Sequence, residues 1–241
     1  MSADGFDATR ALRERLCELV DWFQVHPSEL VEAQEHWLAN KAAAGRADEI
    51  NTCIGCNQAC LDQIFAREIA SCLVNPYACH ETVLTAPALK AKKAVAVVGA
   101  GPAGLAAATT AAERGHLVTL FEASAEVGGQ FNLARRIPGK EEFAETLRYF
   151  LVRLERLGVE VVLGRRAGAE DLAGFDDVLL ATGIEPRLPA IPGIDHPKVA
   201  SYVEVVEGRK VAGARVAIVG AGGIGFDVAE LLTAGNAPDG R

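Results

Sequence analysis

The sequence predicts an α/β fold in which helices cover a parallel sheet. Short apolar runs at 95–98 and 178–180 alternate with longer segments of helical periodicity, such as 143–157. This alternation is typical of βαβ units, whose strands pair in parallel. A glycine-rich turn follows the first run directly, and nearly the same run and turn recur from residue 216. The chain therefore contains a Rossmann-like dinucleotide-binding domain and a second start of the same kind.

The composition indicates a protein that can bury a core but has no basic face for nucleic acid. The chain has 241 residues, is 50% hydrophobic and carries a net charge of −8, so more than one domain is expected. Its apolar runs fall short of the roughly 18 residues of a membrane span. Residues 1–7 lack the basic start and apolar core of a signal peptide. We therefore expect a cytoplasmic protein without nucleic-acid or membrane partners.

Four segments are expected: a helical segment at 1–40, an iron-sulfur segment rich in cysteine at 41–92, an FAD-binding domain at 93–183, and a crossover with the start of an NAD(P)-binding domain at 184–241. This last domain is expected to be incomplete. Residues 8–39 place apolar side chains at helical spacing, with a break at His26-Pro27. Two amphipathic packing helices are predicted there, with Cys17 as a buried thiol.

The cysteine-rich segment has the spacing of a ligand set for one metal centre. It carries Cys53, Cys56, Cys60 and Cys72 in a C-x2-C-x3-C-x11-C pattern. Tetrathiolate zinc is usually held by two C-x2-C pairs roughly 15–20 residues apart, whereas three close thiolates and a remote one suit a [4Fe–4S] cluster. The spacing favours the cluster, with zinc or no metal as alternatives. Cys79 and His80 are expected to be bystanders.

The next domain alternates strands and helices in chain order. The expected strands are 95–98, 116–121, 159–163 and 177–180, and the expected helices are 103–114 and 143–157. Gly115 and Gly158 can end the two helices. The proline-rich stretch after Gly183 is expected to be a domain crossover.

The first glycine turn has the residue types that a pyrophosphate requires. Its members are Gly99, Ala100, Gly101, Pro102, Ala103 and Gly104. Gly99 permits a tight turn, Gly101 lets the backbone approach the phosphates, and Gly104 lets the helix pack close to the strand. The start of the helix offers free N–H groups and a positive dipole.

Two residues after this turn complete the predicted site. Glu122 ends the second strand and can accept hydrogen bonds from ribose hydroxyls, and its charge would repel a 2′-phosphate, so FAD or NAD is favoured over NADP. Gln130 follows a Gly-Gly pair and is expected to offer an amide to the flavin, the alternative being a flexible loop. Arg135, Arg136 and Lys140 form a basic cluster that is expected to be a solvated face, the alternative being contact with a phosphate.

The second glycine turn repeats the spacing with Gly220, Gly222 and Gly225. It is expected to follow a strand at 216–219 and to open a helix. Two such turns separated by a crossover suggest FAD together with a nicotinamide nucleotide, NAD or NADP, and hydride transfer between them. A soft-metal site beside a dinucleotide site indicates electron transfer.

Several motifs together resemble the bacterial NADPH-dependent 2,4-dienoyl-CoA reductases and, more distantly, the trimethylamine dehydrogenase family. The motifs span Cys53–Cys60, Cys72–Pro76, Gly128–Asn132, Ile137–Phe143 and Gly222–Asp227. The resemblance covers about residues 41–235. It implies that NADPH reduces FAD and that single electrons pass through a [4Fe–4S] cluster to FMN in a TIM barrel. It also implies that the four cysteines are the cluster ligands. Similar flavoproteins place the backbone near Ala167 against the adenine.

The resemblance implies an oxidoreductase of unsaturated fatty acid β-oxidation, of which this chain is the electron-transfer section. The FMN barrel has no counterpart here, so FMN is expected only in a separate barrel domain or protein, and no catalytic residue is assigned. This chain alone is expected to be inactive on dienoyl-CoA. One alternative is an NAD(P)H-oxidising flavoprotein subunit like the small subunit of glutamate synthase, although that type would have two cysteine clusters. Another is a non-catalytic fragment that binds FAD.

Overall fold

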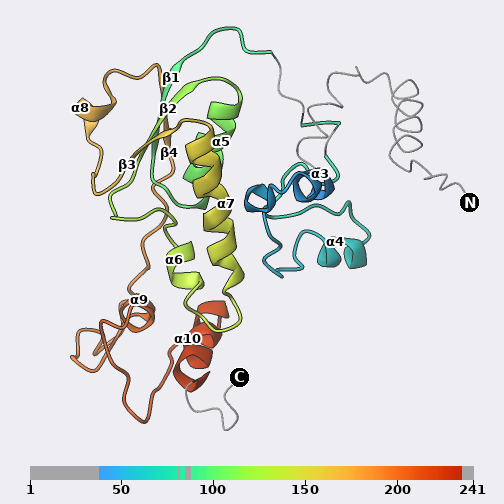
Figure 1. Cartoon of the computed structure of the whole chain (residues 1–241). Coiled ribbons are helices and arrows are strands. Elements are labelled where there is room, and N and C mark those ends of the chain that lie inside the picture. The colour runs from blue at the N-terminus through green and yellow to red at the C-terminus, as the bar shows by residue number, and fades with distance from the viewer. Residues whose placement is uncertain (1–37, 81, 85–87, 235–241) are drawn as a thin grey trace, which may run out of the picture. The chain divides into compact units, whose positions relative to one another are not determined.

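The computed structural model describes residues 38–80, 82–84 and 88–234 (Figure 1). The two predicted N-terminal helices and Cys17 lie outside these residues. The chain divides into two compact units, residues 1–50 and 51–241. In the first unit, helix α3 (Leu38–Ala43) precedes a short 3-10 helix, η1 (Ala47–Glu49). The Lys41 ammonium donates a hydrogen bond to the Glu49 carbonyl at 3.0 Å, which ties these two elements together.

Four parallel strands form the sheet of the second unit in the order β3-β2-β1-β4. They are β1 (Ala94–Val98), β2 (Leu117–Phe121), β3 (Glu160–Val162) and β4 (Asp177–Leu180). In the register of the sheet, Val98 lies opposite Phe121 on one side and Leu180 on the other. The carboxyl ends of these strands therefore meet at one edge, and the predicted parallel α/β fold is confirmed.

Helices α5 (Pro102–Glu113) and α7 (Glu142–Arg156) pack on the sheet through one hydrophobic cluster. Its fully buried members include Val97 of β1, Leu105 of α5 and Leu120 of β2, and Leu147 of α7 is 3% exposed. Burying such side chains stabilises the fold by about 1.5–3 kcal/mol each. This cluster fixes the start of α5, and with it the first glycine turn, above the end of β1.

Shorter helices also occur in the described chain after α5. They are α6 (Phe131–Ala134), α8 (Ala169–Leu172), α9 (Tyr202–Val206) and α10 (Gly223–Thr233). Ile137, Val206 and Val228 form a second hydrophobic cluster, which joins α9 and α10 to the loop after α6. None of the described helices has both the length and the apolar character to cross a membrane.

The prediction of a strand at 216–219 is wrong. This segment is not part of the described sheet. Val216 and Val219 are 51% and 84% exposed. An apolar run becomes a strand only when a neighbouring strand takes up its backbone hydrogen bonds, and in the described part of the chain nothing pairs with it.

Candidate functional site

The first glycine turn is shaped by close backbone contacts at two of its glycines. Gly99 has a φ of +102°, and a Cβ there would lie 2.3 Å from the Ala181 carbonyl oxygen. A Cβ on Gly104 would lie 1.7 Å from the Gly99 carbonyl oxygen. Both positions therefore exclude any side chain. The positive φ of Gly99 and the close approach at Gly104 agree with the tight turn and close helix packing expected from the sequence.

Gly101 differs because a Cβ there would meet no protein atom within 4 Å. Gly101 is the N-cap of α5 and has extended backbone angles. Because it has no side chain, it supplies no capping hydrogen bond to the helix. Pro102 occupies the first helical position and has no N–H to satisfy. The amides of Ala103 and Gly104 face the same end, where a helix N-terminus binds anions. The space in front of Gly101 can therefore accept a pyrophosphate.

Glu122 lies against the first glycine turn at the end of β2. Its Oε2 accepts a hydrogen bond from the Ala100 amide at 2.7 Å, and its Oε1 accepts one from the Ser124 amide at 2.8 Å. A carboxylate has about four acceptor positions, so these two bonds leave capacity for ribose hydroxyls. The structure thus brings Glu122 to the turn, as expected for a ribose-binding acid.

The loop before α6 crosses the same turn. The Gly128 amide donates to the Ala100 carbonyl at 2.8 Å. A Cβ on Gly129 would lie 3.0 Å from the Gly101 Cα, and Gly129 has a φ of +52°. Gln130 follows as the N-cap of α6 and its side chain is exposed. The loop is therefore held beside the first glycine turn, and the amide contact of Gln130 with a flavin stays a prediction.

Ala167 is half-buried in the loop between β3 and α8. Two backbone hydrogen bonds hold the beginning of this loop against the segment after β2: the Arg165 amide donates to the Glu122 carbonyl at 2.9 Å, and the Gly164 amide donates to the Ser124 carbonyl at 2.8 Å. The loop therefore begins beside Glu122. The contact of Ala167 with adenine stays a prediction.

The end of β4 completes the turn and was not among the predicted site residues. The Ala181 amide donates to the Val98 carbonyl at 2.8 Å, and the Ala181 carbonyl covers Gly99. Thr182 and the exposed Gly183, with a φ of +77°, follow at the carboxyl end of the sheet. The sequence signal for this contact was the run of small residues directly after an apolar run typical of a buried strand. Only small residues let the end of a neighbouring strand approach a glycine turn closely.

The second glycine turn repeats the geometry of the first. Gly220 has a φ of +118°, and a Cβ on Gly225 would lie 2.5 Å from the Gly220 carbonyl oxygen. Gly222 is the N-cap of α10 with φ −86° and ψ 178°, close to the φ −73° and ψ −179° of Gly101. The local sequence therefore forms the same turn geometry even though no strand of the described residues directly precedes it.

The cysteine loop is closed by hydrogen bonds on both sides of its ligand candidates. The Ser71 amide donates to the Ala59 carbonyl at 2.6 Å, which brings the residues before Cys72 and Cys60 together. The Asn51 amide nitrogen Nδ2 donates to the Val74 carbonyl at 2.7 Å. Helix α4 (Leu61–Ala66) begins directly after Cys60. The fold of this segment thus draws the fourth cysteine toward the first three.

The four cysteines are free thiols, with Cys53 exposed and Cys56, Cys60 and Cys72 partly buried. The Gly55 amide donates to the Cys53 sulfur at 3.4 Å. Among the described residues, no three His, Cys, Asp or Glu side chains lie close enough to hold one metal ion. The donor chemistry and the closed loop fit a thiolate-bound centre, whereas the side chains as they lie do not form one.

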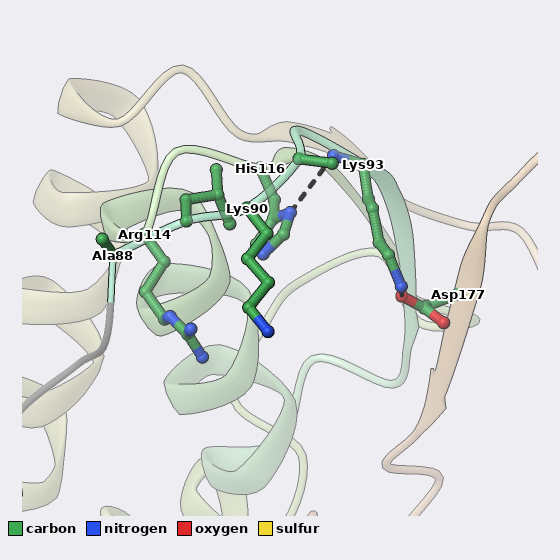
Figure 2. Close-up of a pocket in the computed structure, with 8 residues that line it drawn as sticks. Ala88, Lys90, Lys93, Arg114, His116 and Asp177 are labelled. Carbon is green, nitrogen blue, oxygen red and sulfur yellow. Dashed lines mark hydrogen bonds and ion pairs between the residues drawn. The ribbon is translucent and has the colours of Figure 1, made fainter.

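A separate cavity of about 320 Å³ lies at the opposite, amino-terminal ends of the strands (Figure 2). Its lining includes Lys90, Lys93, Arg114 and His116. Lys93 Nζ lies 2.8 Å from an Asp177 oxygen, and this hydrogen bond raises the pKa of Lys93. Ligands of open parallel sheets bind at the carboxyl ends of the strands, so this cavity is not the nucleotide site.

Comparison with known proteins places the chain among oxidoreductases. Residues 93–237 match the pyridine nucleotide-disulphide oxidoreductase family. The chain is 40% identical over 201 residues to the metal reductase of Desulforamulus reducens, which covers 81% of this chain and 30% of that protein. It is 38% identical over 211 residues to the NADH oxidase of Thermoanaerobacter brockii, which covers 83% of this chain and 32% of that protein.

A solved structure of 2-naphthoyl-CoA reductase in complex with 2-naphthoyl-CoA is similar to this chain with a TM-score of 0.79 and 35% identity. The match covers 83% of this chain and 31% of that one. The chain thus spans about a third of the length of the relatives it matches.

Proposed function

The chain belongs to the pyridine nucleotide-disulphide oxidoreductase family, and from this premise we propose that it is the electron-input section of an NAD(P)H-dependent flavoprotein reductase. The observation that carries the proposal is the pair of glycine turns with matching geometry, at Gly99–Gly104 and Gly220–Gly225. The first turn has Glu122 beside it and would hold FAD. The second would hold the nicotinamide nucleotide.

The chemistry that FAD would supply when bound is two-electron transfer with NAD(P)H. The chain's own residues would bind and orient the FAD. The start of α5 would face the pyrophosphate, Glu122 would accept from the ribose, and Ala167 would lie on the adenine side. Gln130, beside the turn, would offer its amide to the flavin. The Glu122 charge opposes a 2′-phosphate at this first site, whereas the second site leaves NAD and NADP both open.

The assay for this proposal is oxidation of NADH and of NADPH by the FAD-loaded chain, with an artificial electron acceptor. Turnover above that of free FAD supports the electron-input function, and the ratio of the two rates identifies the nucleotide. A chain that retains FAD but oxidises neither nucleotide would instead be the non-catalytic fragment considered above.

We further propose that Cys53, Cys56, Cys60 and Cys72 would hold a [4Fe–4S] cluster, which would supply one-electron chemistry. The spacing and the closed loop support this assignment. Four thiolates are the usual ligands of such a cluster, and forming it would draw the side chains together, because metal binding and local folding are coupled.

Cys60→Ser is expected to remove the cluster, because Cys60 begins α4 and belongs to the close set of three ligands. Anaerobically purified wild-type protein should hold about four irons and four acid-labile sulfides per chain. Cys79→Ser is the matched control, because Cys79 is an exposed cysteine of the same segment outside the ligand set. Stoichiometric zinc without sulfide in the wild-type protein would contradict the assignment.

The electrons are proposed to serve the reduction of a conjugated acyl-CoA on an FMN-containing barrel, which is a separate domain or protein. The motif resemblance to dienoyl-CoA reductases supports this end use, as does the similarity to a reductase solved with an aromatic acyl-CoA. Supplying a purified FMN barrel protein together with dienoyl-CoA and NADPH tests it. Transfer to other acceptors, but not to dienoyl-CoA, would favour a subunit that serves a different catalytic partner.

A further inference from the structure

Residues 128–140, here named the linking segment, lie between the two glycine turns. Figure 1 shows α6, the helix of this segment, between the end of the sheet and helices α9 and α10. At its first end, Gly128 and Gly129 contact the backbone of Ala100 and Gly101. The linking segment is therefore attached directly to the proposed FAD turn.

The second end of the linking segment holds α10, the helix that the other glycine turn opens. Lys140 Nζ lies 2.6 and 2.7 Å from the two carboxylate oxygens of Asp227. Ile137, 3% exposed, packs in one cluster with Val206 and Val228. Asp227 and Val228 lie within one helical turn of Gly225. Lys140, expected on a solvated basic face, is partly exposed and also pairs with Asp227.

Helix α6 connects the two hydrophobic clusters of the second unit. Phe131 packs against the main cluster and stacks edge-on with Phe143, their ring centroids 4.6 Å apart. Leu133, two residues later, packs against the second cluster. A displacement of α6 would therefore disturb both clusters, because packed side chains transmit shifts rather than absorb them.

We propose that the linking segment positions the nicotinamide turn relative to the FAD turn, and that Lys140 is the positioning residue that fixes α10. The consequence of this positioning, efficient hydride transfer, rests on the proposed function. The positioning itself does not require a ligand. Hydride transfer needs the two reacting rings at near-contact distance, so a small displacement of one nucleotide lowers the rate strongly. Lys140 acts through α10 and is not itself a reacting group.

The ion pair acts together with the apolar contacts around it. The side chains of Lys140 and Asp227 are 39% and 26% exposed, and partly exposed pairs stabilise a protein only slightly. Ile137 and Val228, 3% and 8% exposed, join the same two segments through apolar contacts. We therefore expect removal of Lys140 to loosen α10 locally and to leave the main cluster, and the fold, intact.

Lys140→Met in the full chain is expected to speed hydrogen–deuterium exchange in α10 by roughly three- to fivefold, with exchange in α5 unchanged. Lys140→Arg should retain slow exchange, and the swapped pair Lys140→Asp with Asp227→Lys should recover part of it. Arg148→Met is the matched control, because Arg148 Nε bonds Glu145 at 2.7 Å on α7, away from α10. Equal exchange of α10 in the wild type and Lys140→Met would overturn the proposal.

A second readout uses the FAD-loaded chain. Lys140→Met should lower kcat for NAD(P)H oxidation by about tenfold and leave FAD affinity unchanged. Misplacing a reacting group by about 1 Å can lower a rate by more than this. Lys140→Arg should restore kcat. An unchanged kcat alongside faster exchange would overturn the claim that this positioning serves hydride transfer. If the wild-type chain retains no FAD, the proposed function fails, and the exchange result alone still decides the positioning role.

Discussion

Gly101→Val is expected to weaken FAD binding by at least about 100-fold, equivalent to ~2.7 kcal/mol, with little change in the free energy of unfolding. A Cβ at residue 101 meets no protein atom within 4 Å, and the backbone of Gly101 has angles that valine adopts readily. The valine side chain would occupy the space that a pyrophosphate must enter. Loss of the N-cap glycine should cost about 1 kcal/mol or less.

The measurement is a titration with FAD, followed by flavin fluorescence, alongside urea unfolding of the apoprotein. Gly174→Val is the control, because Gly174 also faces open space and lies away from the turn. It should leave both quantities near their wild-type values. Retention of wild-type FAD affinity in Gly101→Val would show that the phosphates do not bind at this turn.

Gly104→Ala is expected to destabilise the fold by about 3 kcal/mol or more. The new Cβ would lie 1.7 Å from the Gly99 carbonyl oxygen, so α5 would have to move away from β1. The sign of this change in stability is informative, because alanine inside a helix is normally about 1 kcal/mol more stabilising than glycine. Close packing between the helix and the turn must therefore outweigh helix propensity.

Unfolding in urea, followed by circular dichroism, measures this change as a lower midpoint. Gly174→Ala is the matched control and is expected to keep the wild-type midpoint. Together, the two predictions separate the glycines of one motif: Gly101 is required by the ligand, and Gly104 by the fold. A Gly104→Ala protein as stable as the wild type would contradict the close approach of α5 to the turn.

The local pattern of the chain was sufficient to predict most secondary structure of the first nucleotide-binding domain. Periodic apolar residues and helix-ending glycines predicted β1, α5, β2, α7, β3 and β4 in the correct order, and the parallel sheet is confirmed. The oxidoreductase class, predicted from the two glycine turns and the cysteines, agrees with the family match and with the names of the relatives. The dienoyl-CoA substrate and the cluster stay predictions.

The sequence by itself determined the two glycine turns, because their geometry depends on glycines a few residues apart: both form, although only the first follows a paired strand. The tertiary structure alone decided which distant residues meet them. Ala181 covers Gly99 because β4 pairs with β1, and Lys140 reaches Asp227 because α6 joins two clusters. The run at 216–219 is apolar enough for a strand. A strand also needs a neighbouring strand to accept and donate its backbone hydrogen bonds, and the local sequence does not determine whether one lies beside it.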